Sequence, residues 1–255
     1  NLRFCLYPLC LFASVSGVPS GSGFQYVFQL KENTRLEGYL LERTADGYVV
    51  SLKRHIKATP GGPPLLGKTI LLDPGHGGSK AEYADGDTGA IGPLGVLWSE
   101  RNINLSNAYV LKAQLEQLGA KVVLSRTEDV PLSLAARLDM SRKLRPDMFI
   151  SLHADSLDDS ADISKVSGFS VWYRDPVARD IGTRVLRKVV DEMGMRDRRL
   201  NQRNFYVVRG TWAPSFLIEA GFVPNTDEFE KMLDPVYQKR MMGHIASAIV
   251  DYYMQ

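Results

Sequence analysis

Four side chains capable of acid–base or metal chemistry lie at the ends of elements that the sequence predicts: His76, Glu100, His153 and Glu219. The two histidines each follow a short apolar run, Glu219 ends a third run, and Glu100 begins a predicted helix. In open α/β sheets, ligands bind outside the carboxyl ends of the strands, so these side chains can meet although they are distant in sequence. Two histidines and a carboxylate, with one position open for water, form a ligand set of catalytic zinc, and a further glutamate can act as proton shuttle.

The segment TILLDPGHGGSK, residues 69–80, gives His76 its setting. Its apolar start is too short for a helix and too apolar for an exposed strand, which indicates a buried strand of a parallel sheet. Proline and glycines then end the strand and keep bulky side chains away from the imidazole. Taken alone, the segment fits an ordinary turn with a surface histidine equally well, so its interpretation depends on partners at other strand ends.

The carboxylates have alternative explanations of unequal weight. Glu100 has a fair one, because acidic residues favour the first turn of a helix. Glu219 ends the segment SFLI and precedes Ala-Gly, so we expect it to be largely buried and therefore paired or functional. Asp73, which precedes Pro74, is as compatible with capping the turn as with supporting the site.

Other candidate residues have ordinary explanations. His55 ends the basic strand segment SLKRH, and His244 lies one position off the apolar stripe of the last predicted helix. The arginine-rich stretch 196–203 predicts a solvated loop more readily than a contact with an anionic substrate.

Composition indicates a soluble globular protein: 44% of the 255 residues are hydrophobic and 24% are charged. A formal net charge of +2 is too small to indicate nucleic-acid binding. The sequence contains no run of 18 apolar residues, so it predicts no transmembrane helix. The apolar opening, residues 1–17, has no initiator Met and is interrupted by Pro8, so we expect any export signal to be missing. Cys5 and Cys10 fit a disulfide and two free thiols equally well.

The first 60 residues are predicted to form a small antiparallel β module. Residues 24–33 alternate apolar and polar positions, and residues 36–54 contain two such runs joined by a hairpin signal at 45–47. So few residues support only a small core, so the module leans on its neighbour or belongs to a larger β domain. We expect this module at 1–60, a linker at 61–66 and a catalytic domain at 67–255.

After the linker, strand and helix patterns alternate, which predicts the α/β class: a mostly parallel twisted sheet flanked by helices. The predicted strands are 69–73, 121–125, 148–152, 168–173, 205–208 and 215–222. The predicted helices are 102–118, 133–144, 176–193 and 235–253.

Four motifs in order carry a family resemblance: LLDPGHGG, GAIGPLGVLWSERNINL, SRTEDVPLSLAARLDMSRKLRPDMFISLHADS and FLIEAGFVPN. Together they resemble the zinc-dependent N-acetylmuramoyl-L-alanine amidases, in their amidase-3 type catalytic domain, from about Gly67 to Gln255. The resemblance implies that His76, Glu100 and His153 bind zinc and that Glu219 is the catalytic glutamate. Asp155 stands where the family commonly has Asn, a difference that does not touch the ligands.

The resemblance implies hydrolysis of the amide between the lactyl group of N-acetylmuramic acid and the L-alanine of the stem peptide. The implied cofactor is Zn²⁺ and the implied partner is peptidoglycan. We therefore expect a monomer that acts outside the cytoplasm, in the periplasm or cell envelope.

Some relatives carry a long helical insertion that plugs the zinc site. Here only 13 residues, 155–167, separate the second histidine strand from the next strand, so we expect an open groove. Two other functions remain compatible with the residues: a zinc peptidase acting within the stem peptide, and an inactive wall-binding regulator.

Overall fold

The computed structural model describes residues 11–21, 23–58, 60–79, 82–156 and 166–255, and its centre is a six-stranded sheet. The strand order is β6-β5-β7-β10-β8-β9. β5 (Thr69–Pro74), β6 (Lys121–Leu124), β7 (Met148–Asp155) and β10 (Ser215–Phe222) run parallel. β8 (Phe169–Tyr173) is antiparallel to β10, and β9 (Asp197–Gln202) is parallel to β8. The predicted mostly parallel α/β sheet is confirmed.

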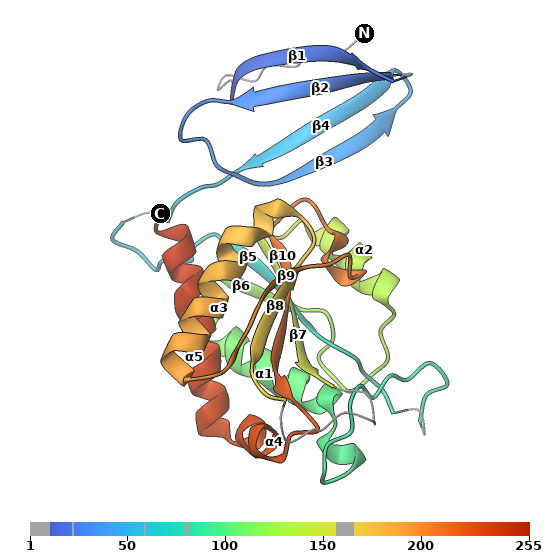
Figure 1. Cartoon of the computed structure of the whole chain (residues 1–255), viewed down its shortest axis with the longest axis vertical. Helices are drawn as coiled ribbons and strands as arrows, with labels where there is room; N and C mark the ends of the chain where they lie inside the picture. The colour runs from blue at the N-terminus through green and yellow to red at the C-terminus, as the bar shows by residue number, and fades with distance from the viewer. Residues whose placement is uncertain (1–10, 22, 59, 80–81, 157–165) are drawn as a thin grey trace.

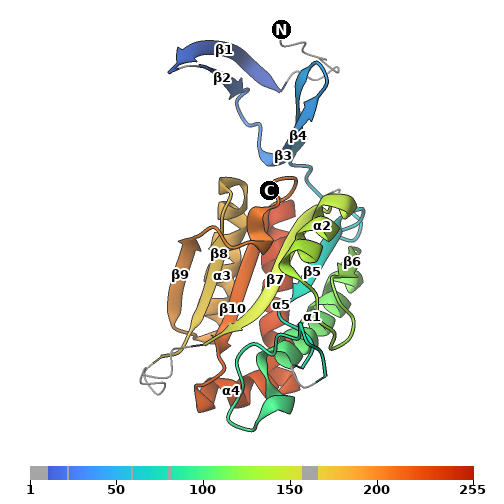
Figure 2. The same cartoon turned by 90° about the vertical axis from the view of Figure 1, so that its right-hand side faces the viewer.

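Helices cover both faces of this sheet (Figures 1 and 2). α1 (Glu100–Gln117), α3 (Arg179–Met193) and α5 (Pro235–Tyr253) pack on one face. α2 (Leu134–Leu144) and the short 3₁₀ helix η4 (Val207–Arg209) cover the other. Two further 3₁₀ turns, η1 (Val96–Trp98) and η3 (Pro176–Ala178), precede α1 and α3.

The central strands are apolar throughout because both of their faces are buried. In β5, Ile70 and Leu72 pack toward α1, α3 and α5, whereas Leu71 packs toward α2 and η4. All three side chains are fully buried. Successive side chains of a strand point to opposite faces, so an uninterrupted apolar run fits only a covered sheet.

Two assignments made from the sequence are wrong. Residues 205–208 were predicted as a strand, but Val207 and Val208 lie in η4 and are buried against the α2 side of the sheet. The arginine-rich stretch 196–203 was predicted as a loop, but it contains the edge strand β9. An edge strand keeps one side in water and so tolerates charged residues, while Leu200 pairs with Val171 and packs against the core.

One helix was not predicted. α4 (Thr226–Leu233) follows β10, and the Asn225 side chain caps it by accepting a hydrogen bond from the Glu228 backbone N–H. Phe229 and Met232 are its buried residues. Eight residues with two buried positions give a weak periodic signal, which explains the omission. Within the described part of the chain, no helix has the combined length and apolarity needed to cross a bilayer.

The first part of the chain forms two antiparallel hairpins (Figure 1). β1 (Phe12–Ser20) pairs with β2 (Gly23–Leu30), and β3 (Leu36–Thr44) pairs with β4 (Gly47–Arg54) around the expected turn. A hydrogen bond from Tyr39 N to Thr211 O, 2.7 Å, and an ion pair between Lys53 and Asp147, 2.8 Å, join the β3–β4 hairpin to the α/β part. The question of a Cys5–Cys10 disulfide lies outside the described residues.

Candidate metal and catalytic site

The four candidate side chains lie at one edge of the sheet, where β5, β7 and β10 end side by side. His76 follows β5, His153 lies near the end of β7, and Glu219 lies in β10. Glu100 is the first residue of α1. The carboxyl ends of the strands thus lie next to one another with these side chains, while the roles of the four residues stay a prediction.

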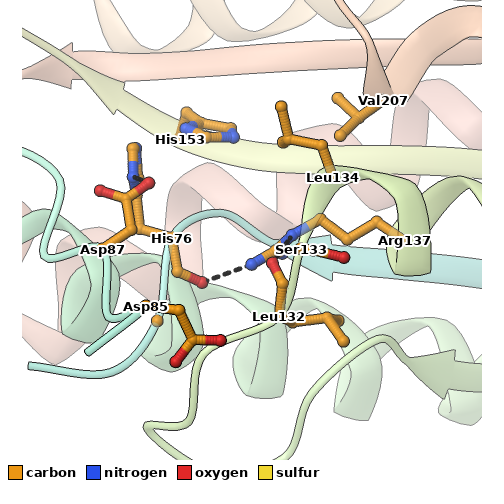
Figure 3. Close-up of a pocket in the computed structure, with 10 residues that line it drawn as sticks. His76, Asp85, Asp87, Leu132, Ser133, Leu134, Arg137, His153 and Val207 are labelled. Carbon is orange, nitrogen blue, oxygen red and sulfur yellow. Dashed lines mark hydrogen bonds and ion pairs between the residues drawn. The ribbon is translucent and has the colours of Figure 1, made fainter. Parts of the chain in front are cut away.

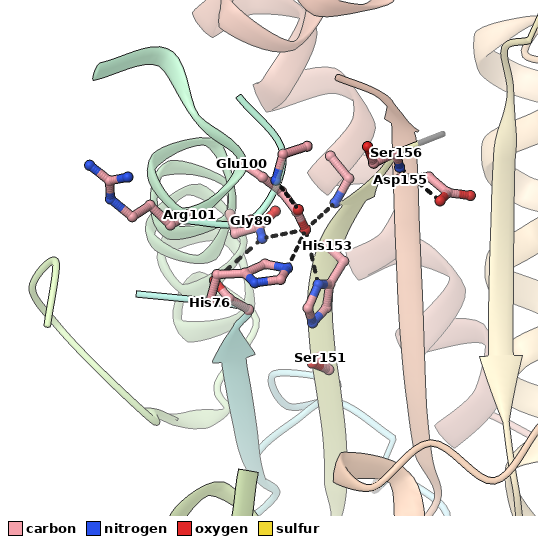
Figure 4. Close-up of polar contacts among 12 residues, drawn as sticks. His76, Gly89, Glu100, Arg101, Ser151, His153, Asp155 and Ser156 are labelled. Carbon is pink, nitrogen blue, oxygen red and sulfur yellow. Dashed lines mark hydrogen bonds and ion pairs between the residues drawn. The ribbon is translucent and has the colours of Figure 1, made fainter. Parts of the chain in front are cut away.

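His76, Glu100 and His153 form a cluster whose ligand atoms all lie within 4.8 Å of one another. His76 Nε2 is 3.1 Å and His153 Nδ1 is 3.0 Å from the same Glu100 oxygen, Oε1 (Figure 4). The two imidazole rings meet edge to face with centroids 4.9 Å apart. Two nitrogens and one carboxylate oxygen that converge in this way could hold a divalent cation such as zinc.

Glu100 points into the protein, unlike an acid that serves only the first turn of a helix. The residue is 4% exposed. Oε2 accepts a hydrogen bond from Ala90 N, 3.0 Å, and Oε1 accepts one from Ala154 N, 3.2 Å. Asn104, one turn further along α1, donates to Oε1 at 3.2 Å. These bonds fix the carboxylate between the two histidines.

Glycines leave the space that the cluster fills. A Cβ on Gly75 would lie 2.2 Å from Cε1 of His153. A Cβ on Gly89 would lie 2.5 Å from Oε2 of Glu100 and 2.8 Å from Cδ2 of His76, and Gly89 has a φ of +63°. Any larger residue would displace a candidate ligand, so these two glycines serve the packing of the site's own side chains.

The backbone of His76 is left-handed, with a φ of 58°, which is uncommon for a residue other than glycine. Arg137 of α2 holds it by donating to His76 O at 2.6 Å (Figure 3). The same guanidinium donates to Pro74 O, 2.8 Å, and to Asp73 Oδ1, 2.6 Å. Arg137 is 2% exposed, so a buried cation fixes the turn that carries His76.

A second buried arginine completes this support. Arg126 donates from Nε to Pro74 O, 3.0 Å, and from Nη2 to Gly75 O, 2.9 Å. Asp73 is fully buried and accepts hydrogen bonds from Ser125 and Ser151, which favours its supporting role over simple capping of the turn. Neither arginine was among the residues predicted from the sequence. The available signal was a charged residue, Arg137, next to the core residue Leu138 in a predicted helix.

Asp87 was also missed. Its Oδ2 lies 2.8 Å from His76 Nδ1, on the side of the ring away from Glu100. Backbone bonds from Gly77 N to Asp87 O, 2.8 Å, and from Asp87 N to Gly77 O, 3.0 Å, hold the two segments together. A carboxylate on the second nitrogen of a histidine fixes the tautomer and the orientation of the ring.

Electrostatics favour a charged cluster in the absence of a metal. Burial acts to raise the pKa of Glu100, but hydrogen bonds from His153 and His76, and the charges of both rings, hold it far below its usual range. Burial acts to lower the pKa of His76, but Glu100 and Asp87 outweigh it and raise that pKa above 6.5. The carboxylate is therefore ionised and available to a cation.

Glu219 stands beside this cluster and outside the ligand group. In the register of the parallel pair β10–β7 it lies opposite His153. Its Oε2 atom is buried and has no hydrogen-bond partner among the described residues. Burial first, and then the charges of Glu100 and Asp155, raise its pKa well above 4.5. A carboxyl group with an unused oxygen next to a cation site can accept and return a proton.

A pocket of about 210 Å³ opens next to the cluster (Figure 3). His76 and His153 line one side, and Leu134, Arg137 and Val207 line another. The site is therefore reachable from the face of the sheet that α2 and η4 cover.

An α/β sheet whose strand ends gather a His–Glu–His cluster and a further buried glutamate offers the side chains that a metal-dependent hydrolase would need. The chain belongs to the N-acetylmuramoyl-L-alanine amidases, because the Amidase_3 family model matches residues 70–251. The matched range includes the whole candidate site and leaves out the two hairpins.

Curated relatives agree with this family. The chain is 32% identical over 190 residues to the N-acetylmuramoyl-L-alanine amidase LytC of Bacillus subtilis, a match that spans 74% of this chain and 36% of LytC. It is 31% identical over 192 residues to the probable cell wall amidase LytH of Staphylococcus aureus, covering 74% of this chain and 60% of LytH. The matches thus span less than two thirds of these two relatives.

Solved structures agree as well. An N-acetylmuramoyl-L-alanine amidase from Clostridium difficile 630 superposes with a TM-score of 0.65 at 28% identity, over 72% of this chain and 96% of that one. The catalytic domain of the amidase CwlV from Bacillus (Paenibacillus) polymyxa gives a TM-score of 0.64 at 29% identity, over 72% and 97%.

Proposed function

We propose that this chain hydrolyses the amide bond between N-acetylmuramic acid and the L-alanine of the stem peptide in peptidoglycan, with Zn²⁺ as cofactor. The observation that carries the proposal is the convergence of His76 Nε2 and His153 Nδ1 on one oxygen of Glu100. Family membership supplies the bond that is cut.

The residues present fit a zinc ion. They offer two imidazole nitrogens and one ionised carboxylate within 4.8 Å, and no fourth His, Cys, Asp or Glu joins the group in the part of the chain that is described. When bound, zinc lowers the pKa of a coordinated water and polarises a carbonyl group. We infer that His76, Glu100 and His153 hold the ion.

In this proposal Glu219 moves the proton. Its partnerless Oε2 accepts a proton from the attacking water and later donates it to the nitrogen of the leaving L-alanine. Arg137 and Asp87 keep His76 in place throughout, from the backbone side and from the ring side. The pocket beside the two histidines receives the muramoyl–peptide junction.

We further propose a site that is open without an activator, in a monomeric protein that acts outside the cytoplasm. The three-residue ligand group supports the first point, and the kinship to cell wall amidases supports the last. The segment on which the open-groove expectation rests includes residues 157–165, which lie outside the described residues. We retain 1–60, 61–66 and 67–255 as the proposed module, linker and catalytic domain.

Mass spectrometry of digested peptidoglycan tests the proposed cleavage. The expected products are peptides that begin with a free L-alanine and glycan strands with free lactyl groups, formed with zinc and not after chelation. Peptides cut at an internal bond would instead identify a stem-peptide peptidase. Binding to the wall without any product would identify an inactive wall-binding protein.

A further inference from the structure

A second cleft lies between the β3–β4 hairpin and the α/β part, on the face that α2 and η4 cover. Its volume is about 360 Å³, larger than the 210 Å³ of the pocket beside the histidines. β3 provides one wall with Leu40 and Leu41, and α2 and η4 provide the other with Arg142 and Arg209. Figure 1 shows β3 as the hairpin strand closest to the α/β part.

The floor of this cleft is tightly built. Tyr39 N donates to Thr211 O and Thr211 Oγ1 donates to Tyr39 O, both at 2.7 Å. Gly38 packs so closely that a Cβ there would lie 2.0 Å from Trp212 O. The Tyr39 hydroxyl also donates to Asp175 Oδ2 at 2.7 Å. The hairpin is therefore fixed against the segment that leads into β10, and the cleft has a defined shape.

The lining of the cleft is positively charged. Arg142 and Arg209 both line it, and none of its lining residues within the described ranges is acidic. Arg209 stacks over Tyr206, 4.7 Å from the ring centroid, and donates to the Asn204 amide oxygen at 3.0 Å. In the described residues it makes no ion pair with a carboxylate. Among the described residues, the one ion pair of Arg142 is an exposed pair with Asp139, at 3.2 Å, which neutralises it weakly.

The cleft and the pocket beside the histidines share their supporting elements. α2 lines the pocket with Leu134 and Arg137, and the cleft with Ser141 and Arg142. In η4, Val207 lines the pocket and Arg209 lines the cleft. Arg137 of the pocket and Ser141 of the cleft are four residues apart on α2, which corresponds to about 6 Å of helix. The two hollows therefore lie within the length of one extended substrate.

We propose that this cleft is a remote subsite that binds a carboxylate-bearing peptide segment of the same polymer that is cut at the histidine cluster. Guanidinium groups recognise carboxylates in a planar, two-pronged geometry, and the two arginines supply the charge that such a segment needs. The proposal rests on the proposed function, because a polymer that enters the catalytic pocket is the one positioned to reach the cleft. It gives the β3–β4 hairpin a part in substrate binding.

Binding of an inactive protein to insoluble peptidoglycan tests the subsite independently of turnover. In a Glu219→Gln background, the pair Arg142→Gln and Arg209→Gln is expected to raise the dissociation constant about tenfold in a sedimentation assay at low salt, since each charge-assisted contact contributes a factor of a few. The matched control removes two exposed arginines of α3, Arg179→Gln and Arg187→Gln, and is expected to leave binding unchanged. Equal loss in both pairs, or no loss in either, would overturn the proposal.

A substitution in the opposite wall of the cleft, which leaves both arginines in place, gives a second test of binding. Leu41 is 61% exposed on β3 and lines the cleft, so Leu41→Glu is expected to weaken binding by placing a negative charge there. Val18→Glu is the matched control, because Val18 is 45% exposed on β1 of the other hairpin and does not line the cleft. An equal effect of both changes would contradict a subsite in the cleft.

Two further experiments identify the anion that the cleft binds and distinguish the subsite proposal from the proposed function. Stripping phosphate polymers from the wall is expected to leave the arginine dependence intact, and its disappearance would assign the cleft to phosphate and refute the peptide carboxylate. In hydrolysis, the arginine pair is expected to lower the ratio of kcat/KM for polymer to kcat/KM for a short muramoyl peptide. If the unsubstituted chain cuts neither substrate, the proposed function fails, while the binding assay still decides the subsite.

Discussion

Two buried histidine–glutamate contacts lie at opposite ends of the sheet, and they differ in what surrounds them. At the carboxyl ends of the strands, His76 and His153 share one oxygen of Glu100 beside a pocket. At the other end, His55 Nδ1 lies 2.9 Å from Glu37 Oε1 beneath the β3–β4 hairpin. Both glutamates are almost fully buried.

The second contact is sealed by aromatic rings. His55 stacks on Tyr253, with the ring planes 5° apart, and meets Tyr252 edge to face. It offers one imidazole and one carboxylate, and it belongs to no metal-compatible group among the described residues. A buried histidine–glutamate pair is therefore not sufficient for chemistry. The number of donors that converge and the access to a pocket distinguish the two ends.

The largest effect is expected at Glu219, the proposed proton carrier, and it distinguishes this residue from the proposed ligands. Glu219→Gln is expected to retain zinc and to lower kcat by about 10³-fold or more, because the amide cannot accept a proton. Zinc content by metal analysis and release of L-alanine amino termini from peptidoglycan measure the two quantities. Near-normal turnover would remove Glu219 from the mechanism, and loss of zinc would make it a ligand.

The two histidine–glutamate contacts can be compared directly by truncating one histidine in each. His76→Ala is expected to lose stoichiometric zinc because one of three ligands is gone. His55→Ala is expected to keep zinc and to lower the free energy of unfolding by about 3 kcal/mol, because Glu37 is left buried without its partner. Metal analysis and urea unfolding of both variants provide the measurements. A zinc loss in His55→Ala would contradict the distinction between the two ends.

A smaller effect is expected at Arg137, which holds the backbone of the proposed ligand His76. Arg137→Lys keeps the charge but cannot reach Asp73, Pro74 and His76 together, so zinc affinity is expected to fall about 10- to 100-fold. Chelator competition measures this affinity, and unfolding of the metal-free variant shows whether the fold alone is affected. If only stability changes, Arg137 supports the sheet and not His76.

The smallest effect is that of pH on the cluster. Since Glu100 and Asp87 raise the pKa of His76, protons compete with zinc for this residue, and zinc affinity is expected to rise with pH, by up to about tenfold per unit, until the pH exceeds the pKa of His76. In the metal-free protein, His76 stabilises the fold below its unfolded pKa of about 6.5 and loses this effect as the pH rises through its folded pKa. Glu100, with its lowered pKa, stabilises above about pH 4.5 and loses the effect on acidification.

Competition titrations with zinc at several pH values, with unfolding of the metal-free protein alongside, measure both effects. His55→Ala should keep the same pH slope of zinc affinity. A slope that is absent in the unsubstituted chain would mean that His76 does not exchange a proton for the metal.

The residues at the strand ends could be located from the sequence because each follows a local pattern that predicts where a strand ends. Apolar runs with a glycine-rich stop predicted the positions of His76 and His153, and the topology rule for α/β sheets predicted their meeting. The contacts of Arg137 and Asp87 could not be predicted in this way, since they depend on backbone oxygens and ring nitrogens of a turn formed elsewhere in the chain. The pairing of His55 with Glu37 was not predicted, for a similar reason: the basic segment around His55 indicated only an ordinary strand end, and the pair forms only when the hairpin docks.

The three proposed ligands lie just after β5, at the start of α1 and in β7, so the cluster is absent until residues as far apart as 76 and 153 have come together. A cation that binds only the assembled cluster shifts the unfolding equilibrium, by about 2.7 kcal/mol at a hundredfold excess over its dissociation constant. Metal binding would thus report that β5, α1 and β7 have assembled. A chain still being synthesised cannot hold the ion before the strand that carries His153 has emerged, so the capacity for hydrolysis follows folding in time.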